Sequence, residues 1–207
     1  MYVPKRYEIK DWPEIERFIR ENPLATLVSR GEEYAVATHV PLELETNERG
    51  ESILTGHVAR PNQHAGLFAS QPNILAIFQS PAQHYISSSW YAHPNVPTWN
   101  YMSVHVYGRI QTVDGERLRT SLEKMTHTHE RVSAHPLSRK DLEDQIDKQL
   151  AGIIGFEIEI VRLEAAYKMS QNRDDRDYVN IIRELEKLED HNARIVAKKM
   201  AELRKVH

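Results

Sequence analysis

The chain has 207 residues, with 27 lysines and arginines against 30 aspartates and glutamates, which gives a formal net charge of −3. This length is enough for one compact domain with a buried core. The near-neutral charge argues against a protein that coats DNA or an anionic membrane over its whole surface. The chain has no cysteine, which excludes disulfides, thiol nucleophiles, iron–sulfur clusters and cysteine-ligated zinc, and fits a cytoplasmic protein. No apolar run approaches the roughly 18–20 residues of a membrane span.

The N-terminal half of the chain predicts one helix followed by short strands. Asp11, Pro13 and Glu14 form a helix-start signal, and Asn22-Pro23 ends that helix. The apolar runs that follow predict strands, one of which is interrupted near Pro41 and pairs with the next. These strands are expected at residues 24–29, 34–44, 53–58, 73–79 and 82–87, with a short helix within 61–70.

The C-terminal half predicts two further strands, at 101–113 and 154–160, and amphipathic helices at 115–132 and 138–150. From Asp174 the composition becomes highly charged. An apolar stripe there predicts one long helix, carried by Ile181, Leu185, Leu188, Ile195 and Leu203. Short strands joined mostly by turns favour an antiparallel barrel with flanking helices, an α+β arrangement that is mainly β. We therefore expect a barrel domain at residues 1–173 and a C-terminal amphipathic helix at 174–207.

The segment from Gly56 to His64 leaves a strand and enters a helix. A helix start offers unpaired backbone N–H groups, and side-chain donors are added by Arg60, Asn62, Gln63 and His64. This combination suits a phosphate group. An ordinary strand-to-helix turn with polar surface residues is the alternative.

Two other segments suggest contacts with a planar ligand. Thr38 and His39 are neighbours in a strand, so their side chains face opposite sides of the sheet. The pair could hydrogen-bond a ligand, or the histidine could make its hydrogen bonds inside a barrel. Aromatic, hydroxyl and amide side chains alternate in residues 87–91 and 96–101. They could enclose a ring system or form a subunit contact, and both roles are compatible if a ligand lies at a dimer interface.

Residues 168–173 follow the last strand and hold two cations, Lys168 and Arg173, which could pair with an anionic ligand. A solvated linker is the alternative. A metal site is not expected: His127 and His129 are spaced i, i+2 and point apart on a helix. The sequence also lacks a Walker loop and the GxGxxG and GxSxG motifs.

These segments, in this order, resemble the PaiB family of FMN-binding-like negative transcriptional regulators, which is related to the flavin-reductase and pyridoxamine-phosphate-oxidase split-barrel superfamily. The similarity extends over essentially the whole chain. The matching motifs are Met1-Tyr2-Val3-Pro4, Ala37-Thr38-His39-Val40-Pro41-Leu42, Gly56-His57-Val58-Ala59-Arg60, Ser89-Trp90-Tyr91, Val96-Pro97-Thr98-Trp99-Asn100-Tyr101, Val104-His105-Val106-Tyr107-Gly108, Gly155-Phe156-Glu157-Ile158 and Lys168-Met169-Ser170-Gln171-Asn172-Arg173.

The resemblance implies a six-stranded antiparallel split β-barrel and a homodimer with FMN in a cleft between subunits. It assigns the FMN phosphate to the strand-to-helix turn, and the ring and ribityl chain to strand ends, with further contacts from the partner subunit. The residues that would bind the phosphate are then Arg60, Asn62, Gln63 and His64. The residues that would contact the ring or the ribityl chain are Thr38, His39, Trp99, Asn100 and Tyr101, and the partner subunit would contribute Lys168 and Gln171. The histidines His39, His57, His64 and His105 become hydrogen-bond donors around an anionic cofactor.

The resemblance implies a repressor of genes for sporulation and secreted degradative enzymes, acting on DNA directly or through a regulatory partner. One face of the C-terminal helix holds five cations, Arg194, Lys198, Lys199, Arg204 and Lys205. This face could contact DNA phosphates, or it could be an ordinary solvated helix face preceded by acidic residues. The alternative function is an FMN-dependent oxidoreductase of the flavin-reductase type. Binding of another cofactor or haem is a third hypothesis, suggested by the 11 histidines alone.

Overall fold

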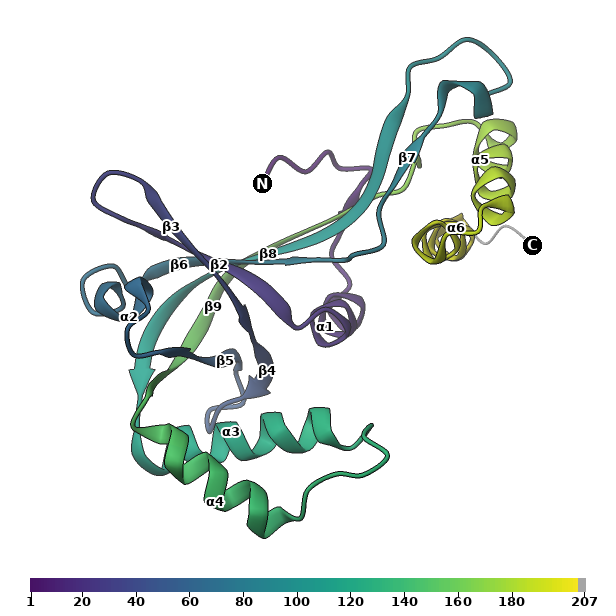
Figure 1. The fold of residues 1–207 in the computed structure, drawn as a ribbon. Helices are drawn as coiled ribbons and strands as arrows, with labels where there is room; N and C mark the ends of the chain where they lie inside the picture. The colour runs from purple at the N-terminus through teal and green to yellow at the C-terminus, as the bar shows by residue number, and fades with distance from the viewer. Residues whose placement is uncertain (205–207) are drawn as a thin grey trace. The chain divides into compact units, whose positions relative to one another are not determined.

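The computed structural model describes residues 1–204, whose strands form an antiparallel sheet and alternate along the chain with helices (Figure 1). The strands are β1 (Glu8–Ile9), β2 (Leu24–Arg30), β3 (Ala35–Pro41), β4 (Glu43–Thr46), β5 (Ser52–Ala59), β6 (Asn73–Gln79), β7 (His84–Ile86), β8 (Thr98–Val113) and β9 (Ile153–Lys168). The helices are α1 (Trp12–Glu21), α2 (Gln63–Leu67), α3 (Gly115–Glu130), α4 (Arg139–Leu150), α5 (Asp175–Lys187) and α6 (His191–Arg204), with a 3-10 turn at Ser88–Trp90.

The strand order is β3-β2-β6-β8-β9-β5-β4, with β1 added to β9 and β7 added to β8. This curled sheet is the expected split β-barrel of the mainly-β, α+β class. The expected count of six strands is wrong, because the described residues contain nine. β1 has only 2 residues, too few for a periodic pattern to reveal it, and the strand expected at 34–44 forms two separate strands.

The division of that strand lies at Pro41, as its sequence predicted. Pro41 has no backbone N–H, and the next residue, Leu42, donates its N–H to Pro23 O at 2.9 Å. The two halves then pair with different neighbours: β3 pairs with β2, from Leu24↔Pro41 to Arg30↔Ala35, whereas β4 pairs with β5. The predicted pairing of this strand with the following one therefore holds only for its second half.

The chain forms two compact units, each built from separate segments. The first unit contains residues 1–18, 78–105 and the described residues from 164 onward; the second unit contains residues 19–77 and 106–163. β8 and β9 each continue from one unit into the other.

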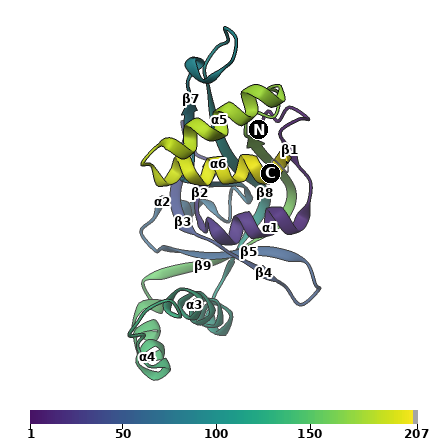
Figure 2. The same cartoon turned by 90° about the vertical axis from the view of Figure 1, so that its right-hand side faces the viewer.

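The second unit combines a buried sheet face with the helices α2, α3 and α4. Leu27, Leu54 and Ile158 are fully buried, and the ring of Phe68, just after α2, meets the ring of Phe156 edge-on at 5.2 Å between centroids. α3 and α4 lie side by side as a helical pair (Figures 1 and 2). They confirm the helices expected at 115–132 and 138–150.

The first unit contains α5 and α6, which pack against each other (Figure 2). Two helices thus form where one was expected at 174–207. α5 ends at Lys187, the backbone of the next residue, Leu188, is extended, and the Asp190 side chain accepts the N–H of Asn192 at 2.8 Å where α6 begins.

This break changes which residues of the C-terminal segment are buried. α6 buries Ala193, Val196, Ala197 and Met200, so Ile195 and Leu203 are not part of its buried face. Lys205 and the two residues after it lie outside the described residues. No helix in the described chain is long and apolar enough to span a membrane.

Candidate functional site

A hydrogen-bonded network joins β3 to the start of α2. Thr38 Oγ1 lies 2.7 Å from His64 Nδ1 and donates to Asn62 Oδ1 at 3.3 Å. The same Asn62 oxygen accepts the backbone N–H of His64 at 2.9 Å and thereby caps α2. The short helix expected within 61–70 is confirmed, and its start brings together Thr38, Asn62 and His64, three of the expected site residues.

His64 is completely buried within this network, with an exposed fraction of 0%. Burial lowers its pKa, and the backbone of Val36 opposes that shift. Its ring stacks on the Phe68 ring at 6.1 Å between centroids. His64 is therefore a buried histidine that fixes the turn between β5 and α2.

Arg60 lies at the other side of the same turn. Its Nε donates to Ala151 O and its Nη2 to Ile153 O, both at 3.0 Å. The guanidinium also lines a cavity of about 720 Å³ together with Arg119 and the first turn of α3. These bonds use two of the five N–H donors of Arg60, and the rest are available to an anion.

The remaining predicted residues of this unit differ in their surroundings. Gln63 is exposed at the first position of α2. His39 is exposed, and as the neighbour of Thr38 in β3 it faces the opposite side of the sheet from the Thr38–His64 network. His57 is half-buried in β5, and burial lowers its pKa.

A second group of predicted residues lies in the first unit. Lys168 Nζ donates to Thr98 Oγ1 at 2.7 Å, and burial followed by the charge of Arg173 lowers the pKa of Lys168. Asn100 is fully buried, and its side chain accepts from Ser170 Oγ at 2.9 Å and donates to Met200 Sδ at 3.3 Å. The beginning of β8 is thus tied to the segment after β9 and to α6.

Gln171 shapes its own turn. Its Oε1 accepts the Met169 N–H at 2.7 Å and its Nε2 donates to Tyr167 O. Ser170 in the same turn has a φ of 60°, a left-handed conformation that is uncommon outside glycine. Residues 168–173 are therefore an ordered turn and not the solvated linker that the sequence left open.

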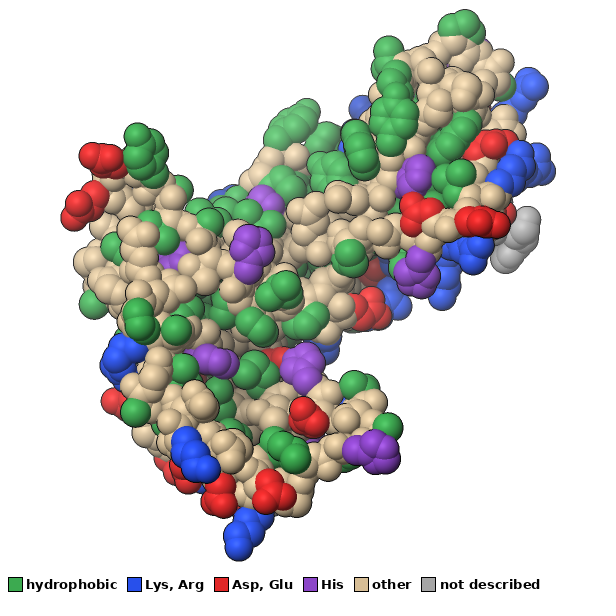
Figure 3. Space-filling model, in the orientation of Figure 1, with side chains coloured by type: hydrophobic (Ala, Val, Ile, Leu, Met, Phe, Trp, Pro, Cys, Tyr) green, Lys and Arg blue, Asp and Glu red, His purple; other side chains and the backbone are tan. Residues whose placement is uncertain are grey.

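The aromatic segment presents an apolar surface. Trp99 is 53% exposed and Tyr85 is 44% exposed, and their rings meet edge-on at 5.9 Å. Val96 is 71% exposed nearby in the chain, whereas Tyr101 is half-buried. Figure 3 shows hydrophobic side chains gathered over β8 and the loop before it.

The predicted residues therefore form two groups, one in each unit. The second-unit group contains Thr38, His39, His57, Arg60, Asn62, Gln63 and His64; the first-unit group contains Trp99, Asn100, Tyr101, Lys168 and Gln171. The predicted site residues did not include the hydroxyl partners Thr98, at the start of β8, and Ser170, because each binds a residue 70 positions away and no local pattern marks it. His105 is half-buried, and burial, helped by the charge of the N-terminus, lowers its pKa.

Several cations of the first unit bind within the chain. Arg173 lies over the Tyr91 ring at 4.5 Å, and Arg204 lies over the Tyr178 ring at 4.2 Å while its Nη2 donates to two backbone oxygens of residues 171 and 173. Lys199 pairs with Glu14. Among the expected cations of the C-terminal helix that the structure describes, Arg194 and Lys198 remain exposed.

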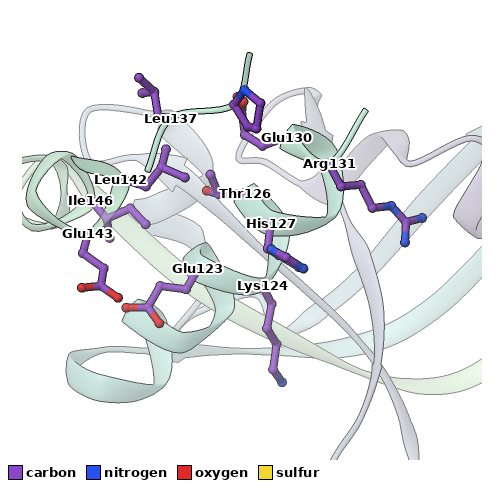
Figure 4. A pocket seen from close by; sticks show the side chains of 11 residues that line it. Glu123, Lys124, Thr126, His127, Glu130, Arg131, Leu137, Leu142, Glu143 and Ile146 are labelled. Carbon is purple, nitrogen blue, oxygen red and sulfur yellow. The ribbon is translucent and has the colours of Figure 1, made fainter. Parts of the chain in front are cut away.

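A further cavity of about 570 Å³ lies between α3, α4 and the segment that joins them (Figure 4). Leu137, Leu142 and Ile146 give it an apolar side, and Lys124 and His127 lie on the α3 side. Sequence reasoning assigned no ligand contact to this cavity, and its lining includes none of the expected site residues.

Comparison with known proteins finds a matching family and a relative that is similar over nearly its whole length. Residues 1–162 match the family described as "Putative FMN-binding domain". The chain is 38% identical to "Protease synthase and sporulation protein PAI 2" of Bacillus subtilis over 204 residues, which is 98% of this chain and 96% of that protein.

Solved structures with a similar fold are distant in sequence. The structure titled "FAD and Heme binding protein" from Mycobacterium smegmatis has a TM-score of 0.59 at 13% identity, covering 84% of this chain and 79% of that one. A flavocytochrome from Azotobacter vinelandii has a TM-score of 0.57 at 16% identity, covering 86% and 78%. At such identities the similarity establishes the fold.

Proposed function

This chain belongs to the FMN-binding domain family that its first 162 residues match, and from that premise we propose that it is a PaiB-like negative transcriptional regulator that binds FMN. The observation that carries the proposal is the 38% identity to PAI 2 over nearly the whole of both chains. By its name that relative is a protease-synthase and sporulation protein. We therefore assign to this chain the repression of sporulation and degradative-enzyme genes.

The phosphate of FMN is assigned to the turn between β5 and α2. Arg60 keeps unused N–H donors beside a cavity, and Gln63 presents an exposed amide. Asn62 and His64 are held in place by the Thr38 network and support the turn. A guanidinium with an amide donor on a rigid turn suits a phosphate dianion.

The ring and the dimer contact are assigned to the first-unit group. Trp99 and Tyr85 offer an exposed aromatic pair, and Lys168 offers a cation whose pKa is lowered by burial. Aromatic residues are enriched at protein interfaces, so this surface suits a homodimer whose two copies share the ligand.

We propose that the protein represses its genes through a partner protein or through its ligand, and not through a broad DNA-binding surface. Arg204 and Lys199 are engaged inside the chain, which leaves Arg194 and Lys198 as exposed cations on α6. Two cations give little electrostatic attraction to a duplex. When bound, FMN supplies hydride or one-electron chemistry, which the oxidoreductase alternative would use.

The test measures FMN affinity and redox turnover in the purified full-length chain. We expect Arg60→Met and Lys168→Met each to weaken FMN binding at least about tenfold, the usual effect of losing one charge-assisted hydrogen bond. Arg109→Met, which removes an exposed arginine of β8, is the matched control and should leave the affinity unchanged.

Unchanged affinity in both Arg60→Met and Lys168→Met would overturn the assigned site. NADPH oxidation with added FMN separates regulator from enzyme: turnover that rises with protein concentration would support the oxidoreductase. Salt-dependent binding to promoter DNA beyond that to random DNA would support direct repression.

A further inference from the structure

The first unit contains a cluster of metal-ligating side chains that the FMN proposal does not use. One carboxylate oxygen each of Asp174 and Asp177 and one imidazole nitrogen of His93 lie within 4.8 Å of one another. Asp174 and Asp177 stand at the start of α5, and His93 lies in the loop between the 3-10 turn and β8. We propose that these three residues bind a divalent transition-metal ion.

The buried carboxylate of Asp177 is the main evidence for a ligand. Asp177 is only 1% exposed. Its Oδ1 accepts the Ala92 N–H at 2.7 Å, whereas its Oδ2 is buried and has no hydrogen-bond partner among the described residues. A buried carboxylate oxygen without a hydrogen-bond partner is unfavourable, and a bound cation would satisfy this atom.

His93 faces that oxygen at a distance that suits a bridging ion. The distance from His93 Nε2 to Asp177 Oδ2 is 3.8 Å, too long for a hydrogen bond. Two metal–ligand bonds of about 2.1 Å span roughly 3.4 Å at a tetrahedral angle and about 4.2 Å in line. An ion between these two atoms therefore fits with a small movement of the His93 ring, which is 54% exposed.

Asp174 supplies the third ligand from the same helix face, because residues at i and i+3 are neighbours on a helix. One of its oxygens accepts the Asp177 N–H at 2.9 Å as the cap of α5, which leaves the other oxygen for an ion. The Ala92–Asp177 bond holds the loop next to His93 against α5, so the three groups are positioned before any ion binds.

The donor set identifies the class of ion. Two carboxylates and one neutral imidazole balance the charge of a divalent cation, and imidazole nitrogen favours zinc and its first-row neighbours over calcium or magnesium. Three protein ligands leave at least one position for water or another ligand. The exposed side of the His93 ring gives the ion a path from solvent.

The test titrates zinc chloride into metal-free full-length protein by calorimetry. We expect one zinc ion per chain, with an affinity that falls at least about tenfold in His93→Ala, since even outer-shell partners of a metal site are worth that much. Asp174→Ser should give a similar loss, and it retains a side-chain oxygen able to cap α5, so the helix still forms. His135→Ala removes another exposed histidine outside the cluster and should bind zinc like the parent.

A thermal measurement separates an ion from a simple His93–Asp177 ion pair. Zinc should raise the melting temperature of the parent and of His135→Ala, and this increase should be lost in His93→Ala and in Asp174→Ser. Equal zinc affinity in all four proteins would overturn the proposal. So would a parent that binds no zinc, or a His93→Ala melting temperature that differs from the parent by the same amount with and without zinc.

Discussion

The Thr38→Val substitution tests whether the network between β3 and α2 supports the phosphate turn. Valine has nearly the shape of threonine, so the change removes a hydroxyl without opening a cavity. That hydroxyl lies 2.7 Å from His64 Nδ1 and 3.3 Å from Asn62 Oδ1, and His64 is fully buried. Leaving a buried imidazole nitrogen without its partner costs about 1–3 kcal/mol of unfolding free energy.

The assay is urea unfolding of Thr38→Val at pH 7.5, paired with an FMN titration. We expect a lower midpoint with an unchanged slope, and weaker FMN binding, because Asn62 also loses a bond that orients it. Thr46→Val, at an exposed position of β4, is the matched control and should change neither quantity. A Thr38→Val protein within about 0.5 kcal/mol of the parent, with the same FMN affinity, would refute the reasoning.

Three further predictions concern stability. Burial lowers the pKa of His57, His64 and His105, so the unfolded chain takes up protons on these groups at a higher pH than the folded protein does. Stability should therefore fall as the pH drops through about 6.5, and a flat urea midpoint between pH 7.5 and 5.5 would contradict this. Gly108→Ala would place a Cβ 2.3 Å from Ile158 Cγ2 and 2.5 Å from Glu159 O. It should therefore lower the unfolding free energy by about 1–3 kcal/mol in a urea titration. Gly66→Ala is the control, because its Cβ would have no neighbouring atom within 4 Å and should not cause a clash. Arg117→Ala removes both hydrogen bonds to the buried Glu157 and should lower the unfolding free energy by about 1–3 kcal/mol in the same urea titration. An unchanged midpoint would show that the pair does not stabilise the attachment of α3 to β9.

The sequence predicted most of the strands because their patterns are local. β6 was expected at its observed bounds, and the interruption near Pro41 followed from the missing N–H of proline. The sequence analysis missed the partner of each half: β3 pairs with β2 across the short turn at residues 31–34, and only β4 pairs with β5. The break between α5 and α6 was missed because an apolar stripe continues through Leu188.

The sequence predicted which residues belong to the candidate site better than it predicted the contacts that these residues make. The turn at residues 60–64 was expected to hold donors, yet the engagement of Arg60 with the carbonyls of Ala151 and Ile153 depends on a segment about ninety residues away. The cluster of His93 with Asp174 and Asp177 was not anticipated at all. Its three members come from two chain segments, so no local spacing marks them as ligands.

The most direct test of the account is an equilibrium titration of the purified full-length protein with FMN, followed by flavin fluorescence and visible absorption. The account predicts saturable binding of one FMN per chain, with the flavin bands shifted from those of free FMN. It also predicts that Arg60→Met weakens this binding and Arg109→Met does not. Fluorescence that follows free FMN up to about 1 mM, where even weak specific sites are filled, would contradict it.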